Sequence, residues 1–304
     1  MNRLHKIGSY VAIILGQQMR APLPQFKNDP FFLLKHHLIS LIVLVPVLIA
    51  LWEFHPITHG NHFWLWFVFC FMLSAPSIPL GLLAAGGCLF SLWYFQPHSF
   101  ARSDALWVLA GIISGMYSSV FMHLVSHRSF KSKPIQAIIG EICSLQQLLS
   151  HHIWSIMHMV HHQYPDDPVR DPHPPLNQNI VIFGANMKSK MALHLQNFYL
   201  EHWKNNPKNK INWSLTLALV IAVYFCYALF WLLLLGPKIF TLFYITSHTI
   251  TSFWYVHFNF ATHRLDKDGK PQILDLEGKL YPFFLIIFCL ELIFIRPITQ
   301  TPPR

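Results

Sequence analysis

Apolar residues gather in six long runs that short polar segments separate. Most of these runs approach the roughly 20 residues that a helix needs to cross the apolar core of a bilayer, about 30 Å thick. The pattern therefore predicts an all-α fold, a polytopic transmembrane helical bundle. The runs are Leu38–Phe54, His62–Leu73, Leu80–Phe95, Ala105–Met122, Trp213–Leu235 and Ile239–Thr262.

The second and third runs are the least certain spans. Pro76 and Pro79 lie between them, so the two runs can instead form one re-entrant hairpin. A further apolar stretch, Tyr281–Ile295, is too short to be counted as a span. Six crossings remain the expectation.

Composition favours the same class of protein. Only 12% of the 304 residues are charged and 53% are hydrophobic, whereas soluble domains carry about 25% charged residues. The mean hydropathy is +0.38. These values predict an integral, multi-pass membrane protein that contacts bilayer lipid.

The net charge of +9 is explained by topology and does not indicate a nucleic-acid partner. Loops rich in Lys and Arg face the cytoplasm, and the opposite loops hold little beyond Arg102 and Lys238. We expect a basic cytoplasmic N-terminus over residues 1–37, followed by a membrane domain over residues 38–304. The basic residues concentrate in Met1–Lys35, Arg128–Lys133, Arg170–Lys210 and Arg264–Lys279.

Two histidine clusters stand out in this apolar chain. His123 and His127 lie four residues apart, and His158, His161 and His162 form a His-x-x-His-His box. Residues four apart share one face of a helix, and imidazole is costly in or beside a bilayer unless it binds something. The pattern predicts a histidine-rich metal-binding cap on the cytoplasmic side. Interfacial histidines that stack with lipid headgroups are the alternative.

The stretch from Gly115 to His173 resembles membrane fatty-acyl desaturases of the acyl-CoA or acyl-lipid delta-9 type. The resemblance rests on the Ser-His-Arg-Ser-Phe run at 126–130, the His-x-x-His-His box and the Asp-Pro-His run at 171–173. It implies oxygen-dependent desaturation of a fatty-acyl chain at a pair of irons. It also implies dioxygen as co-substrate and an external electron donor, such as a cytochrome b5 or a ferredoxin. An acyl or sterol hydroxylase with the same metal remains an alternative.

The resemblance extends to a late Asn-x-x-x-His pair, Asn259 and His263. By resemblance, His263 would bind metal directly and Asn259 would bind through water. A structural histidine at a helix end is the alternative for His263. Asp167, Asp171 and His173 are expected to hydrogen-bond the ligand imidazoles and fix their tautomers without binding metal themselves.

The first histidine box departs from the family pattern by one residue. The family spaces its histidines five apart, which would place the first on Met122, but this chain has His123. One residue turns a helical side chain by about 100°. His123 therefore serves as a ligand only if the helix is locally wound differently, for instance by a π-bulge, or if the four-residue spacing works by itself.

The third box of the family is absent, since no histidine follows His263. Codons permitted for Glu291 to Pro302, read two nucleotides out of register, can spell a His-x-x-His-His box. This motivates the hypothesis that the C-terminus is truncated or frameshifted after about residue 291. Six imidazoles and one asparagine under-supply two irons, so an inactive desaturase remnant is a third interpretation. His151 and His152 are the nearest reserve ligands.

Two spatial expectations follow. We expect His127, His158, His161, His162 and His263 to converge at the cytoplasmic membrane face. We also expect the last three spans to enclose an apolar, acyl-sized slot that ends near the histidines, because acyl chains bind in narrow apolar cavities.

Overall fold

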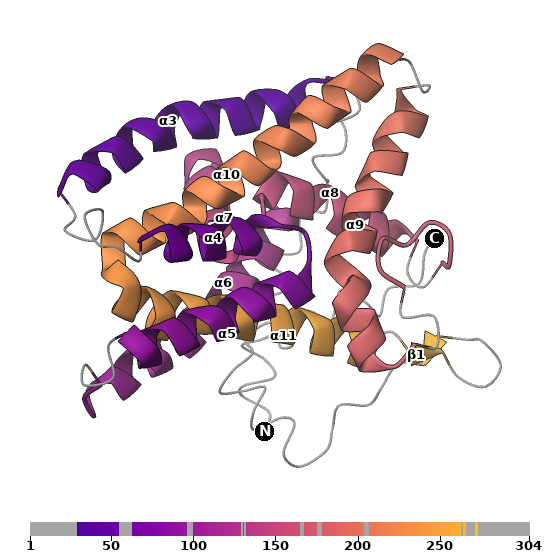
Figure 1. Ribbon diagram of the computed structural model, residues 1–304. Coiled ribbons are helices and arrows are strands. Elements are labelled where there is room, and N and C mark those ends of the chain that lie inside the picture. The colour runs from indigo at the N-terminus through magenta and orange to yellow at the C-terminus, as the bar shows by residue number, and fades with distance from the viewer. Residues whose placement is uncertain are drawn as a thin grey trace.

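The chain folds into a helical bundle (Figure 1). This computed structural model describes residues 29–54, 63–95, 100–128, 130, 132–164, 167–174, 178–203, 207–262, 264–265 and 271–272. The elements in chain order are α3 (Phe32–Phe54), α4 (Phe63–Ser74), α5 (Ile78–Phe95), α6 (Asp104–Ser126), α7 (Lys133–Gln147), α8 (His151–Gln163), α9 (Ile180–His202), α10 (Pro207–Ile239), the π-helical segment η3 (Phe240–Ile245), α11 (Thr246–Thr262), β1 (Arg264–Leu265) and β2 (Pro271–Gln272).

The predicted all-α class is confirmed. Among the described residues, the strands are the two-residue β1 and β2, which pair antiparallel. The apolar segment Tyr281–Ile295 and the C-terminal residues after Gln272 lie outside the described residues.

Four stretches are long and apolar enough to cross a membrane. They are α3, α5, α6 and a continuous stretch from Asn212 to His257. Gly236, with φ 73° and ψ 162°, breaks the last stretch into α10 and the η3–α11 segment, a positive φ that glycine adopts at little cost. Figure 1 shows the chain turning back there, so this stretch supplies two of the six expected spans.

The helix α4 corresponds to the doubtful second span, and it is too short to cross a bilayer. Its 12 residues rise about 18 Å at 1.5 Å per residue, well short of the bilayer core. Together α4 and α5 form a hairpin around Ala75 and Ser77, where Ser77 N–H donates to Ala75 O at 2.7 Å.

The outer faces of the bundle are apolar. Only 11% of the α3 window is buried inside the protein, and exposed side chains such as Ile42 and Val43 cover it. Soluble proteins rarely expose apolar surface on this scale. A lipid-facing helix explains it, as expected for an integral membrane protein.

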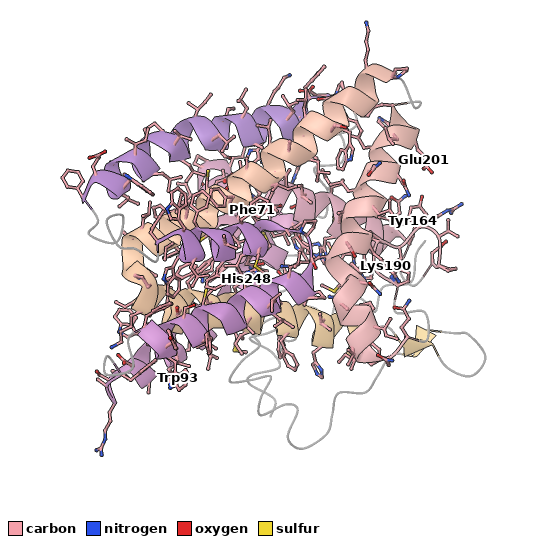
Figure 2. The ribbon with its side chains drawn as sticks, in the orientation of Figure 1. Phe71, Trp93, Tyr164, Lys190, Glu201 and His248 are labelled. Carbon is pink, nitrogen blue, oxygen red and sulfur yellow. The ribbon has the colours of Figure 1, made fainter. Side chains whose placement is uncertain are left out.

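The histidines of both boxes, together with His36, His151 and His152, gather at one end of the bundle. The start of α3, the end of α6, α8 and the end of α11 meet there. At the opposite end Lys238 forms an ion pair with Asp104 at 2.8 Å. Figure 2 shows Lys190 and Glu201 on α9, with Tyr164 beside that helix. Trp93 on α5 lies on the other side of the molecule in the same view.

Close backbone approach fixes α6 against the η3–α11 segment. A Cβ built on Gly111 would lie 2.4 Å from the backbone oxygen of Phe243, and one on Gly115 would lie 2.5 Å from that of Ser247. Thr251 Oγ1 donates to Gly115 O at 3.0 Å across the same contact. Small residues allow such contact between membrane helices. The contact leaves no room for an acyl chain between these helices at that depth.

The helices α7 and α8 form a helical hairpin. Leu148 adopts a left-handed conformation, with φ 51° and ψ 46°, and ends α7. The hairpin is held from outside, because the hydroxyl of Tyr224 accepts a hydrogen bond from Ser150 N at 2.8 Å. The hydroxyl of Tyr255 on α11 also donates to Gln147 Oε1 at 3.0 Å. These contacts set the start of α8, which carries the second histidine box.

Candidate metal centre

Four histidines from two helices converge at one end of the bundle. His123 lies in the last turn of α6 and His127 directly follows that helix. His158 and His162 lie one turn apart on α8. We call His123, His127, His158 and His162 the four-histidine cluster. Its ring centroids lie 4.4–4.9 Å apart for the pairs in closest contact.

The two histidines of the first box come together without a π-bulge. The described part of α6 is α-helical up to Ser126, and the π-helical segment lies in η3 instead. Met122, where the family pattern would place a histidine, is fully buried among apolar side chains. His123 faces His127 and His158. The four-residue spacing is therefore sufficient to bring both imidazoles together.

The spacing of the nitrogens fits a metal. His158 Nε2 lies 3.0 Å from His127 Nε2 and 3.0 Å from His162 Nε2. Imidazole nitrogens bind first-row metals at about 2.1 Å, so two ligands at right angles have nitrogens about 3.0 Å apart. A neutral ring nitrogen carries either one proton or one lone pair. The donor atoms of His123, His127 and His158 all lie within 4.8 Å of one another, so one cation could contact all three.

The electrostatics favour the ligand form of these rings. Burial lowers the pKa of His127 to about 4. Burial, together with the neighbouring imidazoles, lowers the pKa of His158 well below its ordinary value. Metal ligation needs neutral imidazole, so both rings are in the required state at neutral pH. Trp154 stacks on His158 with ring centroids 5.0 Å apart and holds its orientation.

His161 turns away from the four-histidine cluster toward an acidic partner. Its Nδ1 lies 2.9 Å from Asp171 Oδ2, and its ring centroid lies 4.5 Å from that of His173. Burial raises the pKa of Asp171, but the hydrogen bond from His161 and the nearby His173 outweigh burial and hold that pKa at about 2. An ionised Asp171 that accepts from Nδ1 leaves Nε2 of His161 for a metal. His161, Asp171 and His173 also form a group whose donor atoms all lie within 4.8 Å of one another.

The remaining sequence-predicted residues are placed differently. Asp167 accepts hydrogen bonds from the backbone N–H groups of Val169 and Arg170, both at 2.9 Å, and so organises the turn after the box. Asn259 is buried on α11 and donates to Tyr255 O at 2.7 Å. Tyr255 contacts Trp154, with ring centroids 5.0 Å apart, which brings this end of α11 toward α8. His263 lies outside the described residues.

The reserve ligands His151 and His152 join a separate cluster. They lie at the start of α8 with His36 of α3 and Glu141 of α7, and the four donor atoms lie within 4.8 Å of one another. Neither His36 nor Glu141 stands out in the sequence as a candidate ligand. The position of Glu141 on α7 does not by itself predict a metal ligand. Only the chain reversal at Leu148 brings α7 and α8 together.

Comparison with known proteins identifies the family. A search of curated proteins and a search of solved structures both found no match to the chain. The profile of the fatty acid desaturase family matches residues 104–292. That range begins with the first residue of α6, contains both histidine boxes, and covers more than half of the chain. This chain belongs to the fatty acid desaturase family.

Proposed function

We propose that this protein is a membrane oxidoreductase that desaturates a fatty-acyl chain at an iron centre held by its histidine boxes. The observation that carries the proposal is the contact of three Nε2 atoms at His158, with 3.0 Å spacings that match neighbouring ligands of one metal ion. Membership of the family supports iron as that metal. Imidazole-rich sites suit iron and leave positions open for oxygen.

The four-histidine cluster would hold one iron, and His161 would contribute to a second, with Asp171 fixing its tautomer. Asn259, through water, and His263 are proposed as further ligands. Iron supplies the oxidising power that unactivated methylene groups require and that side chains lack. In the overall reaction the acyl chain loses two hydrogens, an external donor gives two electrons and solvent gives two protons, so that dioxygen is reduced to two molecules of water.

The protein residues supply placement and exclusion of water. Burial of His127 and His158 keeps their rings neutral and dry. The contact of α6 with the η3–α11 segment fixes the end of α6, where His123 lies. Because that contact is closed at Gly111 and Gly115, an acyl slot has to follow another face of α6 or α11.

We propose that the histidine end of the bundle faces the cytoplasm, since the basic segments lie beside the boxes in the sequence. An acyl-CoA or acyl-lipid substrate of delta-9 type would enter from the bilayer. A small electron carrier such as a cytochrome b5 or a ferredoxin would dock on the basic face.

The test is expression of the full chain in a desaturase-deficient host, with iron per chain and acyl products measured together. Desaturation gives an acyl chain with a new double bond, whereas hydroxylation adds an oxygen. We expect His158→Asn to abolish iron binding and product, and His202→Asn, a change in the last turn of α9, to leave both unchanged. Product formation by His158→Asn at the rate of the parent chain would refute the assignment. Iron binding without any product in the parent chain would favour the inactive remnant.

A further inference from the structure

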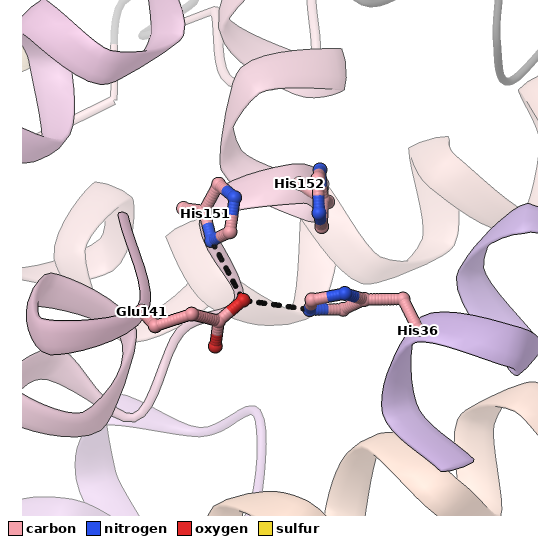
Figure 3. Close-up of side chains that lie close together, drawn as sticks. All are labelled: His36, Glu141, His151 and His152. Atoms are coloured by element: carbon pink, nitrogen blue, oxygen red, sulfur yellow. Dashed lines mark ion pairs between the residues drawn. The ribbon is translucent and has the colours of Figure 1, made fainter. Parts of the chain in front are cut away.

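A second cluster of potential metal ligands lies at the start of α8, away from the four-histidine cluster. Figure 3 shows His36 from α3, Glu141 from α7, and His151 and His152 from α8 turned toward one another. His151 precedes His158 by seven residues, which is two helical turns and a rise of about 10 Å. The two clusters therefore occupy separate places on one helix.

The distances separate a metal site from an ordinary ion pair. Glu141 Oε1 lies 3.3 Å from His36 Nε2 and 3.5 Å from His151 Nδ1. Charge-assisted pairs between imidazolium and carboxylate are shorter, about 2.7–2.9 Å. Four ligands arranged as a tetrahedron around Zn²⁺ at about 2.0–2.1 Å are about 3.3–3.4 Å apart. The observed spacings match the tetrahedron.

The imidazoles of this cluster are in the neutral form that binds metal. Burial and neighbouring imidazoles lower the pKa of His151 to about 3 and that of His152 to about 2, so both rings are neutral. Burial raises the pKa of Glu141, and the hydrogen bond from Tyr227 acts in the opposite direction. Tyr227 reaches that carboxylate through its hydroxyl, at a distance of 3.4 Å.

The rings are held in place by the surrounding helices. A Cβ on Gly140 would lie 2.8 Å from the ring of His151, so glycine is what lets this ring lie against α7. The hydroxyl of Ser144 donates to Gly140 O and accepts from the backbone N–H of His151, both at 2.8 Å. The hydroxyl proton is therefore not directed at His151 Nδ1, which lies 3.3 Å away. The rings of His36 and His152 meet edge to face, with centroids 4.1 Å apart.

We propose that His36, Glu141, His151 and His152 form a second metal site that binds Zn²⁺ or a similar divalent transition metal in tetrahedral geometry. The site would tie the start of α3 to the α7–α8 hairpin. The side chains of His36 and Glu141 are 18% and 41% exposed, so an ion can reach the site from the surface. The proposal does not depend on the iron centre, because the two clusters share no ligand.

The first experiment measures Zn²⁺ binding to the purified, chelator-treated full chain, with Zn²⁺ as the only added metal. Glu141→Gln keeps the size of the side chain but removes its charge. We expect this variant to bind one tight Zn²⁺ fewer, with affinity at that site reduced at least about 100-fold, since even partners outside the ligand set cost about 10–100-fold. Glu53→Gln, at the far end of α3, is the matched control and should bind as the parent chain does.

The second experiment needs no variant and so does not depend on variants that fold. Diethyl pyrocarbonate modifies accessible imidazoles, and mass spectrometry locates the modified residues. Zn²⁺ should protect His36 and His152 in the parent chain and leave His194 on α9 reactive. Equal Zn²⁺ binding by Glu141→Gln and Glu53→Gln, or unchanged reactivity of His36 and His152 with Zn²⁺ present, would overturn the proposal.

Discussion

The close contact between α6 and the η3–α11 segment makes a quantitative prediction about two glycines. A Cβ on Gly111 would lie 2.4 Å from the oxygen of Phe243, whereas ordinary contact begins at 3.4 Å. Gly111→Ala therefore requires the helices to separate by about 1 Å, and a gap of that size forfeits about a quarter to a half of each dispersion contact. A Cβ on Gly86 of α5 meets nothing within 4 Å, so Gly86→Ala is the matched control.

The comparison isolates the steric cost. Both substitutions change glycine to alanine within a helix, so the gain in helix propensity of about 1 kcal/mol is common to both. Overpacking costs about 1–3 kcal/mol. We expect Gly111→Ala to be less stable than Gly86→Ala by that amount, which is a difference of about fivefold to 150-fold in the unfolding equilibrium.

Equilibrium unfolding of the full chain in mixed micelles, with rising SDS and helicity as the signal, gives this difference directly. Gly115→Ala should behave like Gly111→Ala, because its Cβ would lie 2.5 Å from the oxygen of Ser247. If Gly111→Ala and Gly86→Ala unfold at the same SDS fraction, then α6 does not pack on η3 as described.

Three further predictions concern the metal centre. Asp171→Asn should lower iron affinity about 10–100-fold, measured by competition with a chelator, because the amide no longer fixes the tautomer of His161; an unchanged affinity would contradict that role. Iron at about 100 times its dissociation constant should stabilise the parent chain by about 2.7 kcal/mol, and thermal unfolding of His127→Asn should show no such effect. Replacing the residues after Glu291 by the hypothetical out-of-register sequence, which carries a His-x-x-His-His box, should raise iron to two per chain and restore acyl unsaturation in a deficient host. Two bound irons and full activity in the present chain would show that other residues replace the third box.

Helical periodicity made the four-histidine cluster predictable. His158 and His162 share a face because they lie four residues apart, and the same spacing pairs His123 with His127. The prediction that two such pairs meet rested on topology, which places the end of α6 and the box on α8 at one end of the bundle. These features are local, or follow from the direction in which the chain crosses the membrane.

The cluster around Glu141 could not be predicted in this way. It depends on a single left-handed residue, Leu148, that reverses the chain between α7 and α8, and on the packing of α3 from far away in the sequence. The sequence shows His151 and His152 next to the second box. It does not show that these rings turn toward His36 and Glu141 instead of His158.

The π-helical segment η3 has a consequence for the evolution of this chain. A π-turn amounts to one extra residue in an α-helix. Deleting any one residue of Phe240–Ile245 would restore regular winding, shift α11 by about 1.5 Å along its axis and rotate it by about 100°. Thr251 would then leave Gly115 and Asn259 would turn to another face, although every candidate ligand would remain in the sequence. Length variation in this short segment can therefore disable the centre of a homologue whose histidine boxes are intact.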